Sequence, residues 1–184
     1  MTGLASRSQH RMSFLRYALV TVPLVLLLGT ISGTVAGSSA GNPWFAALAK
    51  PQLMPPGWVF PVAWTALYIL LGLSLALVLH ARGARGRGLA VGVFLAQLAL
   101  NYAWSPIFFA AHEVGLAFIV IVLMIILAAL AALLFARIRR AAGLLMLPYL
   151  AWLFFAAFLN WQIGDLNPDA DQLVPPQASA DIPL

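Results

Sequence analysis

The sequence predicts an all-α, polytopic membrane protein, a bundle of five transmembrane helices. Of its 184 residues, 63% are hydrophobic and only 8% are charged, whereas about 25% of the residues in a typical soluble domain are charged. Five apolar stretches each reach the roughly 20 residues that a helix needs to cross the hydrocarbon core. Nine of the ten basic residues lie outside these stretches, and the tenth, Arg16, lies in the first turn of the first one. No segment outside the stretches is long enough to fold as a second domain.

The predicted helices cover roughly residues 14–36, 56–79, 89–110, 114–136 and 142–161. They form one transmembrane domain, residues 14–163, between a basic N-terminal segment, residues 1–13, and an acidic, proline-containing tail, residues 164–184. We expect the tail to be disordered because it has few apolar residues to bury. The connections are short except for the first, 37–55, which is rich in glycine, serine and proline at its start and aromatic further on.

The first predicted helix has two interpretations. A basic start, an apolar core and the small residues near Ser38–Ala40 fit a cleaved signal peptide, which would leave four helices. However, the apolar run is longer than a usual signal core of about 7 to 15 residues. In addition, Gly29, Gly33 and Gly37 form a small-xxx-small ridge that suits close helix packing. We favour a retained first helix that packs this ridge against another helix.

The second predicted helix begins among prolines and presents aromatic rings on one face. Pro55 and Pro56 suit the first turn of a helix, where the backbone amides lack partners in any case, and Pro61 removes one further backbone bond. These prolines fix how the first loop approaches the helix. The rings are spaced four residues apart and so share a face: Phe60, Trp64 and Tyr68.

The third and fifth predicted helices carry similar stripes, whereas the fourth is apolar throughout. The stripe residues, which share one face of each helix, are Gln97, Asn101, Trp104 and Phe108 on the third and Tyr149, Trp152, Ala156 and Asn160 on the fifth. An unpaired amide near the middle of a span is costly. Gln97 and Asn101 therefore either bridge helices, worth about 0.6 kcal/mol each, or line a ligand pocket, and we favour the pocket. For Trp44, Trp58 and Trp161, near the membrane boundaries, an interfacial belt is the competing interpretation.

The charge pattern predicts the orientation of the chain in the membrane. Nine of the ten basic residues lie before or in the first turn of the first helix, or in the second-to-third and fourth-to-fifth connections, which places them on one side. Lys50 and the five acidic residues fall on the other side. By the positive-inside rule the N-terminus is cytoplasmic and the C-terminus lies opposite. Because basic loops beside membrane spans explain the positive net charge, no nucleic-acid partner is expected.

Several functional classes are disfavoured by residues that are absent or scattered. There is no cysteine, which excludes disulfides, thiolate metal ligands and thiol nucleophiles. His10, His80 and His112 lie in separate flanks, so no metal site is predicted. No charged residue lies deeper than a helix end, which argues against an ion-coupled transporter. No acid–base or nucleophile pair is present in the spans, so no catalytic residue is predicted.

Three blocks of the sequence are long and ordered: WFAALAKPQLMPPGWVFPVAWTALY, QLALNYAWSPIFF and PYLAWLFFAAFLNW. They resemble the signature blocks of the tryptophan-rich sensory protein or translocator protein (TspO/MBR) family, once called peripheral benzodiazepine receptors, and the resemblance spans roughly residues 14–161. It implies a five-helix bundle, usually a homodimer, that binds protoporphyrin IX and haem-related tetrapyrroles. Many members also bind cholesterol and synthetic drugs of the isoquinoline or benzodiazepine type.

The resemblance implies that Trp44 in the first loop and Trp152 on the fifth helix line the tetrapyrrole site. The remaining site residues that it implies are Trp64, Tyr68, Asn101, Trp104, Tyr149 and Ala156. Aromatic faces can stack on a flat porphyrin ring, whose carboxylates need polar or cationic partners, and Lys50 is the basic residue near the mouth. Leu53 replaces a tryptophan found in many members. The arginine of the family's proposed cholesterol motif is missing after Trp161, which argues against a sterol ligand.

The function expected from this resemblance is tetrapyrrole binding in porphyrin handling, transport or stress sensing. The porphyrin is then a ligand, and no cofactor is required. The alternative is an enzyme that degrades porphyrin in light, because tryptophans at the positions of Trp44 and Trp152 are implicated in such a reaction in some bacterial relatives. No acid, base or nucleophile supports that reaction here, so it would depend on the photochemistry of the ligand and on tryptophan radicals.

Overall fold

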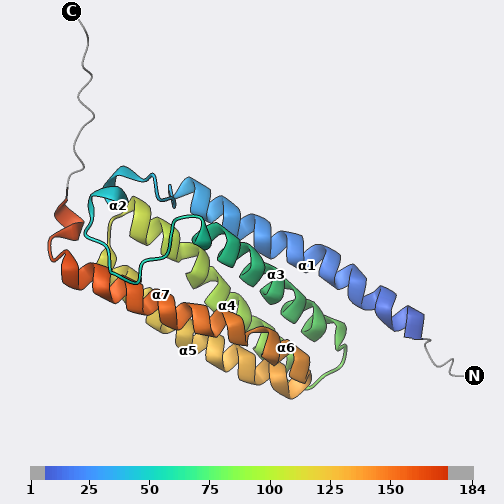
Figure 1. Ribbon diagram of the computed structural model, residues 1–184. Coiled ribbons are helices and arrows are strands. Elements are labelled where there is room, and N and C mark those ends of the chain that lie inside the picture. The colour runs from blue at the N-terminus through green and yellow to red at the C-terminus, as the bar shows by residue number, and fades with distance from the viewer. Residues whose placement is uncertain (1–6, 174–184) are drawn as a thin grey trace, which may run out of the picture.

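The computed structural model describes residues 7–173, and within this range it is a bundle of helices without strands (Figure 1). In chain order the elements are α1 Arg7–Val35, α2 Pro43–Ala47, α3 Val59–His80, α4 Arg87–Ser105, the π-helix η1 Pro106–Ala110, α5 Val114–Ile138, α6 Arg140–Leu145, α7 Leu147–Leu166 and the 3-10 helix η2 Ala170–Gln172.

Five helical segments of the described range are long and apolar enough to cross a membrane. They are Met12–Val35, Val59–His80, Arg87–Ala110, Val114–Ile138 and Arg140–Leu166. Each overlaps one predicted helix, so the five-helix, all-α prediction is confirmed. The fifth predicted helix is divided into α6 and α7 at Met146, two residues before Pro148. Cleavage of the first helix as a signal peptide stays an open alternative.

Helices α1 and α3 approach each other closely because glycines remove side chains from their contact. A Cβ atom on Gly72 would lie 2.6 Å from the Cα atom of Val22, and one on Gly29 would clash with the ring of Tyr68. At the same contact the hydroxyl of Thr21 donates to the backbone oxygen of Gly72 over 2.8 Å. Gly29, the first residue of the predicted glycine ridge, therefore serves packing within this chain.

Another glycine of the ridge ends α1. Gly37 has a positive φ of 67°, which glycine adopts without steric cost. Its N–H donates to the oxygen of Thr34 over 3.1 Å, and the N–H of Ser38 donates to the oxygen of Gly33 over 2.9 Å. This pair of bonds is a Schellman motif, which satisfies carbonyl groups at a helix end. Gly37 thus directs the chain into the first loop instead of packing against a helix.

An irregular turn connects α4 to α5. In η1 the N–H of Ala111 donates to the oxygen of Pro106 over 2.9 Å, a five-residue separation that makes this turn wider than an α-helix. His112 then has a positive φ of 62°, which is uncommon for a residue other than glycine. The His112 ring stacks on Trp44, with 4.4 Å between the ring centroids. The turn therefore lies against the first loop.

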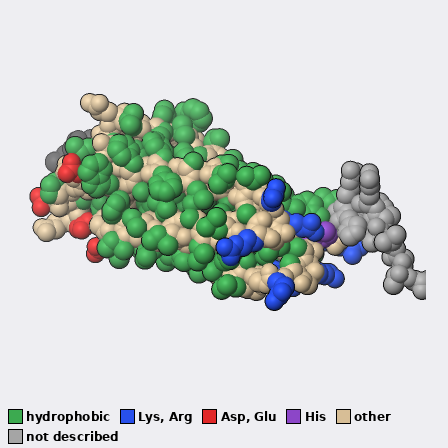
Figure 2. Space-filling view, turned by 90° about the horizontal axis from the view of Figure 1, so that it is seen from below, with side chains coloured by type: hydrophobic (Ala, Val, Ile, Leu, Met, Phe, Trp, Pro, Cys, Tyr) green, Lys and Arg blue, Asp and Glu red, His purple; other side chains and the backbone are tan. Residues whose placement is uncertain are grey.

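Charged side chains separate to the two ends of the molecule. On the face shown in Figure 2, the basic side chains gather at one end and the Asp and Glu side chains at the other; Lys50, in the first loop next to Ala49 and Asn167, is an exception and lies at the end with the acidic side chains. Between these ends the surface is largely apolar, with exposed side chains such as Leu24, Ile126 and Phe154. An apolar girdle between polar ends suits a protein whose helices face lipid. We call the two ends the basic end and the acidic end.

At the acidic end the chain folds back after α7. Residues 167–173, which we call the closing segment, begin with Asn167, whose side chain pairs with the backbone of Ala49 in the first loop. Oδ1 of Asn167 accepts from the Ala49 N–H over 2.8 Å, and Nδ2 donates to the Ala49 oxygen over 3.0 Å. Nδ2 also donates to the oxygen of Ile163 over 2.8 Å. One amide side chain therefore ties the first loop to the end of α7.

Two further bonds hold the closing segment in place. Nε1 of Trp44 donates to the oxygen of Ala170 over 2.9 Å, and Oδ1 of Asp171 accepts from the N–H of Val114, at the start of α5, over 3.1 Å. The sequence predicted disorder from residue 164 onward. The structure differs over residues 164–173, because residues 164–166 continue α7 and the side-chain bonds hold the closing segment; the rest of the predicted tail lies outside the described residues.

Candidate functional site

Aromatic rings from α3 and α7 converge around Trp64. The ring centroid of Trp64 lies 5.3 Å from that of Tyr68, 6.4 Å from that of Tyr149 and 6.4 Å from that of Trp152. The ring of Phe60 lies 6.0 Å from that of Trp152. Residues three or four apart share a helix face, so the predicted spacing accounts for this convergence.

Beside the rings, buried hydrogen bonds join α3, α4 and α7. The hydroxyl of Tyr68 donates to Oδ1 of Asn101 over 2.9 Å, and Nδ2 of Asn101 donates to the hydroxyl of Tyr149 over 3.1 Å. The Tyr149 hydroxyl in turn donates to Oε1 of Gln97 over 2.8 Å. Such bonds are strong in a low-dielectric interior, so both amides fix the two tyrosines. We call these rings and amides the aromatic–amide cluster: Trp64, Tyr68, Gln97, Asn101, Tyr149 and Trp152.

Two hydrogen-bond donors of the aromatic–amide cluster have no partner among the described residues. They are Nε2 of Gln97, a side chain with 0% exposure, and Nε1 of Trp152. The great majority of buried polar groups in proteins are paired. Flat apolar walls with a few polar groups are typical of small-molecule sites. The cluster is therefore chemically suited to a flat ligand that carries hydrogen-bond acceptors.

Trp44 and Trp104 belong to a second aromatic group, at the acidic end. Trp44 is 1% exposed, and besides its stack on His112 it meets the Phe108 ring edge-on at 5.4 Å. Trp104 stacks on Phe108 at 4.9 Å, and its Nε1 lies 3.4 Å from Oδ1 of Asn160, to which it donates. The indole of Trp44 is thus enclosed by protein groups, whereas Trp104 packs against both aromatic groups.

The structure brings most of the predicted site residues together. Trp64, Tyr68, Asn101, Tyr149 and Trp152 belong to the aromatic–amide cluster, Ala156 packs against the same core, Trp104 lies at its edge, and Trp44 lies in the second group. Gln97 is not among the eight site residues that the family resemblance implies, but the helical spacing predicted that it lines a pocket, and it belongs to the cluster through its bond to Tyr149.

Sequence reasoning also missed Tyr102. Its hydroxyl donates to the oxygen of Val25 over 2.8 Å, and its ring lies 6.0 Å from that of Tyr68. Tyr102 thereby links α4 to α1 beside the aromatic–amide cluster. Spacing gave no signal for it, because it lies off the stripe that contains Gln97 and Asn101.

Lys50, the expected cation near the mouth, bonds to the protein itself. Its Nζ donates to the backbone oxygens of Ala46 over 3.2 Å and of Leu48 over 2.9 Å. It also lies 4.8 Å from the centroid of the Phe45 ring. Burial lowers the pKa of Lys50 below its ordinary value. The ammonium group therefore serves first to close the end of α2.

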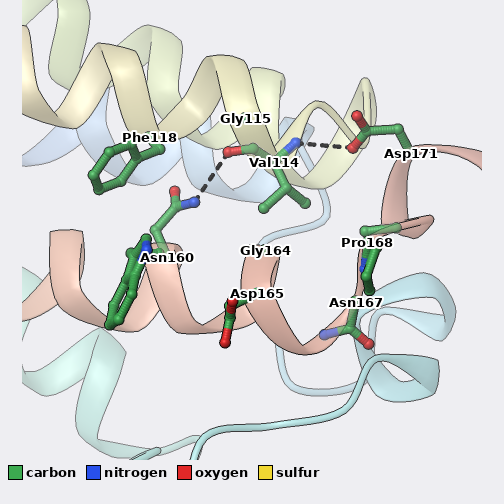
Figure 3. Close-up of a pocket in the computed structure, with 11 residues that line it drawn as sticks. Val114, Gly115, Phe118, Asn160, Gly164, Asp165, Asn167, Pro168 and Asp171 are labelled. Carbon is green, nitrogen blue, oxygen red and sulfur yellow. Dashed lines mark hydrogen bonds between the residues drawn. The ribbon is translucent and has the colours of Figure 1, made fainter.

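A separate groove of about 390 Å³ lies between α5 and α7 at the acidic end (Figure 3). Its walls include Phe118, Trp161 and Asp165. Nδ2 of Asn160 donates to the oxygen of Val114 over 3.0 Å across the groove. None of the eight predicted site residues lines it. Residues 7–173 contain no group of three or more His, Cys, Asp or Glu side chains able to hold a metal ion.

Known proteins are similar in sequence to this chain over most of its length. The sequence matches the TspO/MBR family over residues 20–166. It is 40% identical over 149 residues to the tryptophan-rich protein TspO of Chlorobaculum tepidum, covering 80% of this chain and 93% of that protein. It is 37% identical over 141 residues to the translocator protein of Ovis aries, covering 76% and 83%. It is 38% identical over 124 residues to the tryptophan-rich sensory protein of Cereibacter sphaeroides, covering 67% and 77%. This chain is therefore a multi-pass membrane protein and belongs to the TspO/MBR family.

Proposed function

We propose that this protein binds a tetrapyrrole, protoporphyrin IX or a haem-related porphyrin, at the aromatic–amide cluster and acts in porphyrin handling, transport or stress sensing. The observation that carries the proposal is the cluster itself, in which rings from two helices surround Trp64 and two buried donors lack partners. A porphyrin offers a flat apolar ring for stacking and polar edge groups for the donors.

The names of the relatives support this direction. They include a tryptophan-rich sensory protein, a translocator protein and, in Rhodobacter capsulatus, Protein CrtK, which is 34% identical to this chain over 146 residues. We extend the proposal to isoquinoline and benzodiazepine drugs as further flat ligands and to a homodimer in the membrane, with the N-terminus in the cytoplasm. Sterol is left out, because no arginine follows Trp161 in α7.

The proposal is tested by titrating the purified protein with protoporphyrin IX in the dark while tryptophan fluorescence is followed. Binding predicts quenching that saturates, since the tryptophans of the aromatic–amide cluster lie at the site. Empty detergent micelles with free tryptophan serve as the control for pigment absorption. Quenching that rises without saturation, as in the control, would reject tetrapyrrole binding.

A second candidate function is light-dependent degradation of porphyrin. It is favoured by the pairing of two tryptophans: the ring centroids of Trp64 and Trp152 lie 6.4 Å apart. In addition, Nε1 of Trp152 has no partner among the described residues. Bleaching of bound protoporphyrin under controlled illumination should then be faster than that of free pigment. It should be lost in Trp64→Phe or Trp152→Phe, because phenylalanine is harder to oxidise than indole, but kept in Trp58→Phe, at an exposed position. Bleaching equal to that of free pigment leaves the protein as a binder.

A further inference from the structure

We propose that Gln97 determines ligand specificity at the aromatic–amide cluster. Its Nε2 group donates to a neutral hydrogen-bond acceptor on the ligand, such as the carbonyl oxygen of an ester, an amide or a protonated carboxyl group. This inference rests on the proposed tetrapyrrole function and adds the chemical class of the group that the ligand must carry.

The hydrogen-bond chain fixes which end of the Gln97 amide is open. The hydroxyl of Tyr149 already accepts from Nδ2 of Asn101, at 3.1 Å, so its own proton is free to be donated. That proton goes to Oε1 of Gln97, at 2.8 Å. The oxygen of the Gln97 amide is therefore used, and Nε2 is left with no partner among the described residues. Turning the Gln97 amide alone would leave the proton of Tyr149 without this acceptor, since Asn101 already presents its Nδ2 to Tyr149.

The open donor is well buried and lies next to the proposed ligand walls. Gln97 has 0% exposure, so bulk water does not reach it. Through Tyr149 it is joined to Trp64, whose ring centroid lies 6.4 Å from that of Tyr149. Trp152, three residues after Tyr149 on α7, carries the other unpaired donor of the cluster. An unsatisfied donor in such a place is costly, and a ligand acceptor relieves that cost.

The acceptor is expected to be neutral because the aromatic–amide cluster contains no charged side chain. Along α4 the nearest basic residue is Arg87, ten positions before Gln97, and a rise of 1.5 Å per residue puts it about 15 Å away. A carboxylate anion buried against one neutral amide would lack a counter-charge and lose its hydration. A carbonyl oxygen needs only the hydrogen bond. The geometry therefore favours esters, amides and protonated acids over carboxylate anions at this position.

The test compares two apolar porphyrins, protoporphyrin IX dimethyl ester, which carries ester carbonyls, and etioporphyrin, which carries only alkyl groups. Their dissociation constants are measured in the dark in the same detergent for the wild type, Gln97→Met, Gln97→Glu and Gln162→Met. Within each protein, the ratio of the two dissociation constants cancels the effect of that protein's stability. When this ratio is compared between proteins, the partitioning of each porphyrin into the micelle cancels as well. Gln162 is a matched control on α7, since its unpaired buried atom is Oε1, an acceptor.

The wild type should bind the ester about three- to tenfold more tightly than etioporphyrin, the range expected for one net hydrogen bond. Gln97→Met should remove this preference for the ester, because the site then lacks the Nε2 donor. Gln162→Met should leave the preference unchanged. Gln97→Glu should keep the preference when protonated, because a neutral carboxyl group still accepts from Tyr149 and donates to the ligand. Loss of affinity for both porphyrins by an equal factor in Gln97→Met would show a purely structural role and overturn the inference.

Two other outcomes are distinguished by the same measurement. If the wild type binds both porphyrins equally well, tetrapyrrole binding stands but the Gln97 inference fails. If it binds neither these porphyrins nor protoporphyrin IX, the proposed function fails and the inference fails with it.

Discussion

Asn167→Ala should open the first loop without unfolding the bundle. The substitution removes both bonds between the Asn167 side chain and the backbone of Ala49, which measure 2.8 and 3.0 Å. Each such bond contributes about 0.5 to 1.5 kcal/mol net. Because Ala49 is exposed and water competes for its backbone, we take the lower end for each bond, about 1 to 1.5 kcal/mol for the pair. That corresponds to a roughly tenfold shift in the opening equilibrium of the loop.

Hydrogen exchange of the peptide covering residues 43–55 measures this opening directly. We expect the amide of Ala49, which bonds to Oδ1 of Asn167, to exchange about tenfold faster in Asn167→Ala. Asp165→Ala is the matched control, since Asp165 is an exposed residue at the same helix end and its side chain has no hydrogen bond or ion pair with another described residue. Peptides from α3 and α4 should not change. Equal exchange of the loop in wild type and Asn167→Ala would refute the assignment of the closing segment as a tie on the first loop.

Three further predictions follow from packing, hydrogen bonding and charge. Gly72→Ala should destabilise the protein by about 1 to 3 kcal/mol through overpacking, since its Cβ would lie 2.6 Å from Val22; thermal unfolding should show no loss for Gly92→Ala, where nothing lies within 4 Å. Tyr149→Phe should cost about 1 to 3 kcal/mol, because Asn101 and Gln97 lose their partner, whereas Tyr17→Phe, at an exposed contact with Arg82, should cost under about 0.5 kcal/mol; equal effects in unfolding assays would contradict this. Reporters at the N-terminus and at Arg85 should be cytoplasmic and one at the C-terminus should not, and termini on the same side would contradict the predicted orientation.

Hydropathy and helical spacing made much of this fold predictable. A span of about 20 apolar residues is a strong signal because the bilayer sets its length. The three- and four-residue spacing of Trp64 and Tyr68, of Gln97 and Asn101, and of Tyr149 and Trp152 fixed which residues share a face. In the structure these three faces meet and bury the amides with the tyrosine hydroxyls, so five of the eight predicted site residues lie in one cluster.

What could not be predicted depends on contacts between distant parts of the chain. The bond from Trp44 to Ala170 joins residues 126 positions apart, and no periodicity relates the first loop to the residues after α7. From hydropathy, residues 164–173 were predicted to be a polar tail. Hydropathy carries no information on the hydrogen bonds by which Asn167 and Asp171 accept from backbone N–H groups of other elements. Lys50 likewise looked free to meet a ligand, yet backbone oxygens of its own loop bind it.

The central claim, that a tetrapyrrole binds against the aromatic–amide cluster, is tested most directly by one pair of tryptophan variants. The dissociation constant of protoporphyrin IX is measured in the dark for the wild type, Trp152→Leu and Trp58→Leu. Trp152 lies in the cluster, whereas Trp58 is 68% exposed on the surface. Loss of a stacking ring should weaken binding up to about tenfold in Trp152→Leu and leave Trp58→Leu equal to the wild type. Equal affinity in all three proteins, or a loss confined to Trp58→Leu, would contradict the claim.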